Sequence, residues 1–289
     1  MASPKVTSMT VERLIEETRT VYSLPLFYAR LNDAINHPRT SISDITRIIN
    51  EDQGLSACIL KLANSPMFGY YSKVDSILKS VTIIGTQQLR DLALASSVIK
   101  VFRGIPKELL SMEQFWKHSI SCGIIARCLA TYLREGNVER YFVTGILHDV
   151  GQLVMCAAMP DAMTLTITSS KDNRQLYHLT ERQLLGFDHA EVGSSLFQAW
   201  KIPASVYEPV ACHHLPGNAK LFPLEAAVIH LSDLICQGLE FGANAEWCVS
   251  SLDESAWQRL GLPTGILETI VKLAEPQIAE TCAILTEEI

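Results

Sequence analysis

The stretch GILHDVGQL, residues Gly145–Leu153, places a histidine beside an aspartate within otherwise apolar sequence. Around it, residues at helical spacing share one face, and this face is formed by Phe142, Gly145, Asp149, Gln152 and Cys156. His148 lies three residues after Gly145, close to the same face. Because a buried ionisable side chain needs a partner or a metal ion, the stretch predicts a helix that carries polar ligands into the interior.

The same helical period extends outward through most of the chain. Proline or glycine separates many of the apolar stripes, as at Pro25, Pro38 and Gly85. The stripes lie in residues 11–22, 27–35, 45–49, 55–62, 89–99, 115–133, 142–156, 192–200 and 266–278. Alternating strand patterns are lacking, apart from a short extended piece expected around Tyr70–Ser76. We therefore predict an all-α protein in which an N-terminal helical bundle packs on a C-terminal one.

A break in the pattern suggests where the two bundles meet. Gly104 and Pro106 interrupt the helical period in the segment RGIPKE. We place the boundary there, with an N-terminal helical subdomain over residues 1–108 and a second subdomain over residues 109–289.

Composition narrows the class of protein. The chain has 289 residues, of which 48% are hydrophobic and 19% charged, as expected of a globular protein. A net charge of -7 argues against nucleic acid or an anionic membrane as the main partner. The first residues have no apolar core of the signal-peptide type, so we expect a cytoplasmic protein. None of the eight cysteines forms a C-x-x-C pair, and we expect small buried side chains rather than a redox site.

Potential metal ligands recur on helix after helix of the C-terminal half. Imidazole and carboxylate groups are ligands for first-row metal ions. The candidate ligands are His118, His148, Asp149, His189, His213, His214 and Asp233. Each histidine taken singly is also explained as an ordinary core or surface residue, but seven such residues on inward faces favour a shared site. His230 is read as a supporting residue or a core histidine, and His37 and His178 as loop or surface residues.

These residues carry a family resemblance. The HD pair, with His118 upstream and Asp233 downstream, resembles the signature of the HD phosphohydrolase superfamily. Four motifs in the first half resemble the HDOD family of bacterial signalling output domains, over roughly residues 20–240. They are SLPLF (23–27), IINEDQGL (48–55), KLANSPMFG (61–69) and SVTIIG (80–85). The resemblance implies an HD-type helical bundle in the C-terminal half.

The resemblance also implies roles for the candidate ligands. His118, His148, Asp149 and Asp233 occupy the four HD positions, and the other histidines match those of the related HD-GYP phosphodiesterases. One or two divalent ions, such as iron, manganese or zinc, are then expected. His118, His148 and Asp233 would hold one ion, His189, His213 and His214 the other, and Asp149 would bridge them. His148 and Asp149 are the expected catalytic residues.

Two departures from the HD-GYP pattern bear on activity. Gln152 stands where that pattern has a lysine, so a cation for phosphate is missing. His213 and His214 are followed by Leu-Pro-Gly and not by a Gly-Tyr-Pro motif. Two functions therefore stay open: a metal-dependent phosphohydrolase acting on a phosphoester or nucleotide, and a non-catalytic regulatory module that binds a ligand or a protein.

The segment Ala63–Tyr71 is the candidate surface for a signalling protein partner. Asn64-Ser65-Pro66 predicts a helix stop and turn, after which Phe68, Tyr70 and Tyr71 could offer aromatic rings to a partner. The alternative is that these rings pack between the two subdomains.

Overall fold

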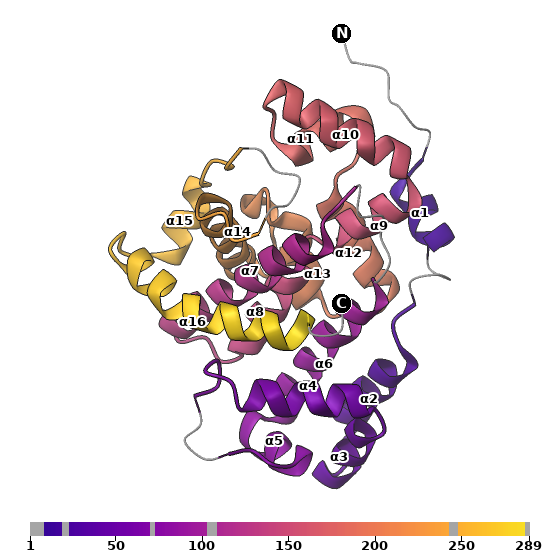
Figure 1. Cartoon of the computed structure of the whole chain (residues 1–289), viewed down its shortest axis with the longest axis vertical. Helices are drawn as coiled ribbons and strands as arrows, with labels where there is room; N and C mark the ends of the chain where they lie inside the picture. Colours follow the sequence, from indigo (N-terminus) through magenta and orange to yellow (C-terminus); the bar gives the residue numbers. More distant parts are fainter. Residues whose placement is uncertain (1–8, 19–22, 70–72, 103–108, 243–247, 287–289) are drawn as a thin grey trace.

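The computed structural model describes residues 9–18, 23–69, 73–102, 109–242 and 248–286, and it is built from helices (Figure 1). No strand occurs within these ranges, which confirms the prediction of an all-α protein. In the expected extended piece, residues 70–72 lie outside the described residues, residues 73–76 are neither helix nor strand, and Ser76 has extended backbone angles, φ -149° and ψ 153°.

In its described residues, the N-terminal half contains six helices. They are α1 (Val11–Thr18), α2 (Leu26–Asn36), α3 (Ile42–Asn50), α4 (Gln53–Ala63), α5 (Ile77–Ile84) and α6 (Thr86–Val101). Ser41 caps α3 in a capping box with Asp44. Asn64 ends α4, and its side chain exchanges two hydrogen bonds of 2.8 Å with the backbone of Val74. This confirms the predicted helix stop and gives Asn64 a structural role.

The C-terminal half is a larger bundle. Its helices are α7 (Met112–Tyr132), α8 (Val138–Leu147), α9 (Val150–Ala158), α10 (Pro160–Asn173), α11 (Tyr177–Leu184), α12 (His189–Ala199), α13 (Ala204–Cys212), η1 (Pro216–Asn218), α14 (Pro223–Gly238), α15 (Glu254–Leu260) and α16 (Ile266–Thr286). Helix α7 packs against α8, α14 and α16, and α12 packs against α9 and α13.

One predicted helix is in fact two. The stripe over residues 142–156 predicted a continuous helix, but α8 ends at Leu147 and α9 begins at Val150. Asp149 leaves helical geometry, with φ -98° and ψ 3°, and precedes the first residue of α9. The apolar pattern gave no sign of the break, because most residues of both α8 and α9 are buried. The HD pair thus occupies a junction between two helices.

The two bundles pack closely on each other. Helix α6 contacts α2 of its own half and α8 of the other half, and α4 contacts α16. Helices of both halves therefore form the interface. Helix α1 lies apart from α2–α5 and packs on α9 and α12 of the C-terminal bundle (Figure 1). Residues 103–108, where the sequence suggests the boundary, lie outside the described residues.

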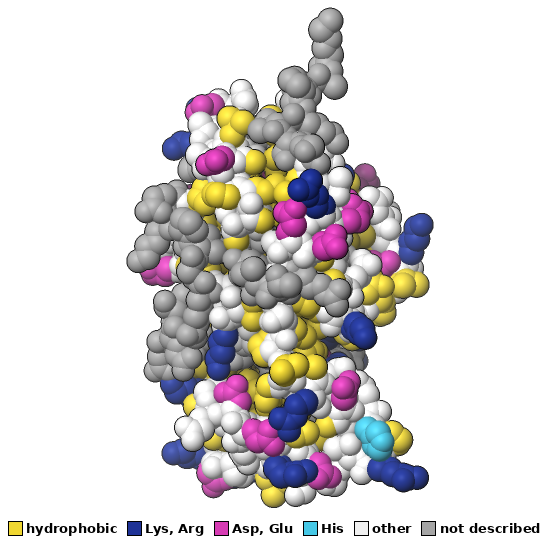
Figure 2. Space-filling model, turned by 90° about the vertical axis from the view of Figure 1, so that its right-hand side faces the viewer, with side chains coloured by type: hydrophobic (Ala, Val, Ile, Leu, Met, Phe, Trp, Pro, Cys, Tyr) yellow, Lys and Arg dark blue, Asp and Glu magenta, His cyan; other side chains and the backbone are white. Residues whose placement is uncertain are grey.

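The most apolar stretch of the described residues belongs to the core. Residues Val138–Ala158, which comprise α8 and α9, have the length and mean hydropathy (1.2) of a membrane-crossing helix. However, 89% of the apolar window is buried inside the protein, which accounts for its composition. On the face seen in Figure 2, acidic and basic side chains are interspersed.

Candidate metal site

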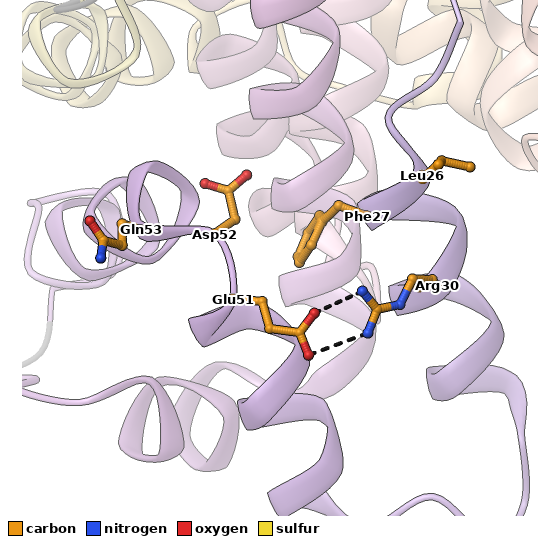
Figure 3. Close-up of a pocket in the computed structure, with 6 residues that line it drawn as sticks. All are labelled: Leu26, Phe27, Arg30, Glu51, Asp52 and Gln53. Atoms are coloured by element: carbon orange, nitrogen blue, oxygen red, sulfur yellow. Dashed lines mark hydrogen bonds and ion pairs between the residues drawn. The ribbon is translucent and has the colours of Figure 1, made fainter.

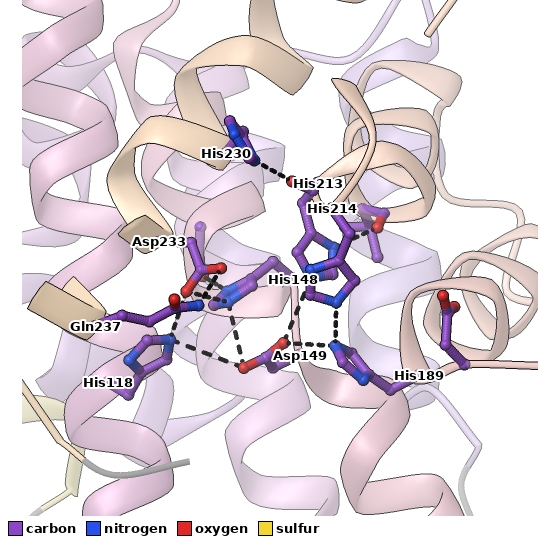
Figure 4. A network of polar contacts seen from close by, with 12 residues as sticks. His118, His148, Asp149, His189, His213, His214, His230, Asp233 and Gln237 are labelled. Carbon is purple, nitrogen blue, oxygen red and sulfur yellow. Dashed lines mark hydrogen bonds and ion pairs between the residues drawn. The ribbon is translucent and has the colours of Figure 1, made fainter. Parts of the chain in front are cut away.

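All seven candidate ligands converge at one place in the C-terminal bundle (Figure 4). His118 comes from α7 and Asp233 from α14, while His148 and Asp149 lie at the junction of α8 and α9. His189 is the first residue of α12, and His213 and His214 follow α13. Six of the seven side chains are buried, and His214 is half-buried.

His118, His148 and Asp233 form a first group. The Nε2 atom of His118 lies 3.1 Å from Oδ1 of Asp233, and Nε2 of His148 lies 3.7 Å from the same oxygen. These three ligand atoms all lie within 4.8 Å of one another. That separation suits three donors around one ion.

His189, His213 and His214 form a second group with the same compactness. The Nε2 atoms of His189 and His214 are 2.9 Å apart. The rings of His213 and His214 have centroids 3.8 Å apart. Three imidazole nitrogens therefore face one small volume.

Asp149 lies between the two groups and turns one oxygen toward each. Its Oδ2 lies 3.3 Å from Nε2 of His148 and 3.8 Å from Nε2 of His118. Its Oδ1 lies 3.2 Å from Nε2 of His189 and 3.7 Å from Nε2 of His213. The carboxylate is therefore placed to bridge two ions.

Unsatisfied nitrogens support a metal site. The Nε2 atoms of His118, His148 and His213 are buried and make no hydrogen bond, although carboxylate oxygens lie within 4 Å of each. Buried polar atoms in folded proteins almost always have partners. Three such nitrogens that converge beside two carboxylates match the donor set of a zinc, iron or manganese site.

Backbone carbonyls orient two of the imidazoles. Nδ1 of His148 donates to the carbonyl oxygen of Gly145 at 2.7 Å, and Nδ1 of His213 donates to that of Val210 at 2.7 Å. With the proton on Nδ1, the Nε2 lone pair is free to bind a metal ion. The amide of Gln237 donates to Oδ2 of Asp233 at 2.9 Å and orients that carboxylate.

When no ion is bound, the buried carboxylates raise the pKa values of two histidines of the site. Burial disfavours a charged ring at His148, but the Asp149 carboxylate outweighs it and raises the pKa of His148 well above 6.5. At His189 burial also opposes the charge, yet Glu181 and then Asp149 raise the pKa well above 6.5. Burial and the neighbouring His148 lower the pKa of His213 to about 3. Without metal, Asp149 thus favours a proton on His148, and Glu181 and Asp149 favour one on His189; metal ions would replace those protons.

A glycine permits the close contact between α9 and α12. A Cβ atom on Gly151 would overlap the carbonyl oxygen of His189 and approach the backbone nitrogen of Gly193 to 2.8 Å. Only a residue without a side chain lets α9 approach α12 so closely. The contact brings Asp149 and His189, on the two helices, within reach of each other.

The structure overturns the sequence interpretation of His178. It was expected on a loop or surface, but it lies on α11, is 6% exposed, and stacks on His214 with ring centroids 3.9 Å apart. Exposed Leu179 and Arg182 on the same helix give α11 little apolar periodicity, so the pattern hid its inward face. His37 is exposed, as expected.

Two further supporting residues connect to the site. Glu181, which the sequence analysis missed, is fully buried and accepts a 2.6 Å hydrogen bond from Nδ1 of His189. No local motif marks Glu181, because its partner is eight residues away. His230 is buried and donates from Nδ1 to the backbone oxygen of His213 at 2.8 Å, so it supports the chain beside a ligand.

Gln152 takes no part in the polar contacts of the site. Its side chain is buried, and neither its amide oxygen nor its amide nitrogen has a hydrogen-bond partner. The cysteines are all free; four of them are buried, as expected, and the other four are half-buried.

The helical fold and the His/Asp site together define an all-α protein with an HD-type candidate metal site. The model of the HDOD domain matches residues 21–216, more than half of the chain, and the chain therefore belongs to the HDOD domain family. The family membership expected from the motifs is thus confirmed.

Known proteins give the same assignment of fold. A solved structure from Shewanella amazonensis SB2B, of a protein assigned provisionally to the phosphohydrolases, has 26% identity and a TM-score of 0.74, covering 94% of this chain and 97% of its own. An HDOD domain protein of unknown function from Geobacter sulfurreducens has 22% identity and a TM-score of 0.75, covering 95% and 96%. An uncharacterised Treponema pallidum protein is 28% identical over 193 residues, 66% of this chain but only 37% of that protein.

Two of the N-terminal motifs, SLPLF and IINEDQGL, meet at a pocket whose residues are far in sequence from the candidate metal ligands. Phe27 of SLPLF points toward Glu51 and Asp52 of the second motif, whereas the side chain of Leu26 points away from them (Figure 3). Arg30 forms two hydrogen bonds with Glu51, of 2.7 and 3.3 Å, along one wall. Leu26 is 84% exposed at the rim. Residues of these two motifs therefore line a pocket at the surface, while others, such as Ile49 and Leu55, are buried in the core.

Proposed function

We propose that this chain is a metal-dependent phosphohydrolase of the HDOD family that acts on a phosphoester or nucleotide in cytoplasmic signalling. The observation that carries the proposal is the position of Asp149, with one oxygen toward each of two three-ligand groups. His118, His148 and Asp233 would hold one ion, His189, His213 and His214 would hold the other, and Asp149 would bridge them.

The residues of the chain have distinct parts in this proposal. Two bound ions would lower the pKa of a water molecule toward about 7 and polarise a phosphoryl oxygen. His148 and Asp149 hold the reacting centre in place, and burial of the ligands keeps bulk water away from it. His214 is the half-buried member of the seven, so the substrate approaches from its side.

The test begins with metal content. Purified protein is expected to contain up to two ions per chain by elemental analysis, with a mixture of metals because affinity alone selects poorly among them. Asp149→Ala removes the bridging carboxylate and is expected to release both ions. The exposed His37→Ala is the matched control and should retain them. Equal metal content in the parent and in Asp149→Ala would refute the proposed site.

Activity is tested on the metal-loaded protein. Phosphomonoesters, linear phosphodiesters, nucleotides and cyclic dinucleotides are offered separately, and hydrolysis of at least one class is expected. Turnover should fall to background in Asp149→Ala. Gln152→Lys restores the cation of the related phosphodiesterases and should raise any turnover, because a cation beside the ions stabilises phosphate.

A non-catalytic regulatory role is the second candidate, and two observations favour it. Gln152 supplies no charge for phosphate, and Leu26 and Glu51 line an open pocket away from the metal site, where a ligand or a signalling protein would bind. Loaded protein that hydrolyses none of these substrates, with no gain in Gln152→Lys, would establish this alternative over catalysis.

A further inference from the structure

Helix α11 supplies none of the seven ligands, yet one of its faces lies against the second group. Tyr177, His178 and Glu181 lie on this face, at positions that neighbour each other around a helix. All three are buried. Tyr177 and Glu181 contact His189, and His178 contacts His214.

Glu181 holds His189 by two hydrogen bonds. Its Oε2 accepts from Nδ1 of His189 at 2.6 Å and from the backbone nitrogen of the same residue at 3.0 Å. The first contact places a proton on Nδ1 and directs Nε2 toward Asp149 and His214. The second ties α11 to the first N–H of α12. The ring of Tyr177 stacks beside His189 at 6.1 Å and limits its rotation.

His178 holds His214 by stacking. The two rings are nearly parallel, with centroids 3.9 Å and planes 15° apart. Within the described part of the chain, Nδ1 of His214 has no hydrogen bond such as those that orient His148, His189 and His213. The stacked ring of His178 therefore orients this half-buried ligand together with the ring of His213, at 3.8 Å, and the 2.9 Å contact between Nε2 of His214 and Nε2 of His189.

The first group is oriented without α11. His148 donates to Gly145 on its own helix, and Asp233 accepts from Gln237 on its own helix. We infer that α11 is a positioning helix for the second ion alone, with Glu181 and His178 as its positioning residues. This inference rests on the proposed two-ion site and adds that the two ions are bound with separately controlled affinities.

The test measures how many ions bind, by titrating metal-free protein with Mn²⁺ and by elemental analysis of the loaded protein. Glu181→Gln keeps the shape of the side chain but weakens its hydrogen bond to His189. Loss of such a supporting partner lowers metal affinity by roughly 10- to 100-fold. We expect that loss for the second ion, while the affinity for the first is unchanged.

His178 is tested with a pair of variants. His178→Ala removes the stacked ring and should lower the affinity for the second ion in the same way. His178→Phe retains an aromatic ring without nitrogen atoms and should restore the binding of two ions. Leu179→Ala is the control, because Leu179 lies on the same helix but is 43% exposed. A further readout is thermal unfolding without metal, which should differ little between His178→Phe and the parent.

The outcomes separate the inference from the proposed function. A parent protein that takes up no ion contradicts the proposed function itself. A parent with two ions whose Glu181→Gln and His178→Ala variants bind both with parental affinity overturns only the role of α11. An equal loss of affinity for both ions, or failure of His178→Phe to restore the binding of two ions, also overturns the role of α11.

Discussion

At the scale of single residues, metal binding depends on which histidines of the site are protonated. His148 and His189 carry raised pKa values because carboxylates face them, whereas burial and neighbouring histidines lower the pKa of His213. A metal ion needs neutral imidazole. Binding of ions must therefore displace protons from His148 and His189, and the affinity for metal is tied to pH.

This coupling predicts opposite pH dependences with and without metal. A group whose folded pKa is raised stabilises the protein below its unfolded pKa, near 6.5 for histidine, and this stability is lost as pH rises through the folded value. Metal-free protein should therefore lose thermal stability as pH rises above 6.5. The stabilisation by added metal should increase over the same range, because fewer protons compete.

Calorimetry of the two forms across that range checks the prediction. Titration in buffers of different ionisation enthalpy also reports the protons released when metal binds. Metal affinity that does not change with pH would show that His148 and His189 are not the groups displaced.

At the scale of elements, the site depends on a helix junction and on a close contact. The break between α8 and α9 lets adjacent residues His148 and Asp149 point into one site, which two neighbours on a continuous helix do not do. The contact between α9 and α12 at Gly151 brings His189 to Asp149.

Gly151→Ala is expected to damage both stability and metal binding. The added methyl group meets the His189 carbonyl, so α9 and α12 must separate, at a cost of about 1–3 kcal/mol. Because His189 moves with α12, the second ion should be lost before the first. Denaturant unfolding and metal content measure the two effects. Gly238→Ala, at the end of α14 with no atom within 4 Å of the new carbon, is the control and should behave like the parent.

At the scale of the whole molecule, the two bundles are expected to unfold together. Helices α6 and α8, and helices α4 and α16, pack across the interface. The guanidinium of Arg127 on α7 lies 5.4 Å from the ring of Phe68, so this member of the predicted aromatic surface packs between the halves. Tyr70 and Tyr71 lie outside the described residues, and a partner surface there stays a proposal.

Two spectroscopic probes test this cooperativity. All four tryptophans follow residue 115, and the three that the structure describes, Trp116, Trp200 and Trp257, belong to the C-terminal bundle, so fluorescence reports that bundle, whereas circular dichroism reports helices in both. We expect the two denaturation curves to coincide and to shift equally on addition of metal. Loss of dichroism before fluorescence would mean that the N-terminal bundle unfolds by itself.

The sequence by itself determined the helical class, most helix positions and the residues that meet at the site. The period of apolar residues reports which face of a helix is buried, and His118, Asp149 and Asp233 all fell on such faces. The motifs determined the family, because short stretches such as KLANSPMFG and GILHDVGQL retain their order along the chain.

Only the tertiary structure decided how these residues are held. The helix break at His148 and Asp149 was hidden because buried, mostly apolar residues continue on both sides of it in α8 and α9. The roles of His178 and Glu181 depend on α11 lying against α12 and the end of α13, a contact between segments that no local pattern encodes. Periodicity records whether a side chain is buried, whereas the partner that it meets there is set by how distant helices pack.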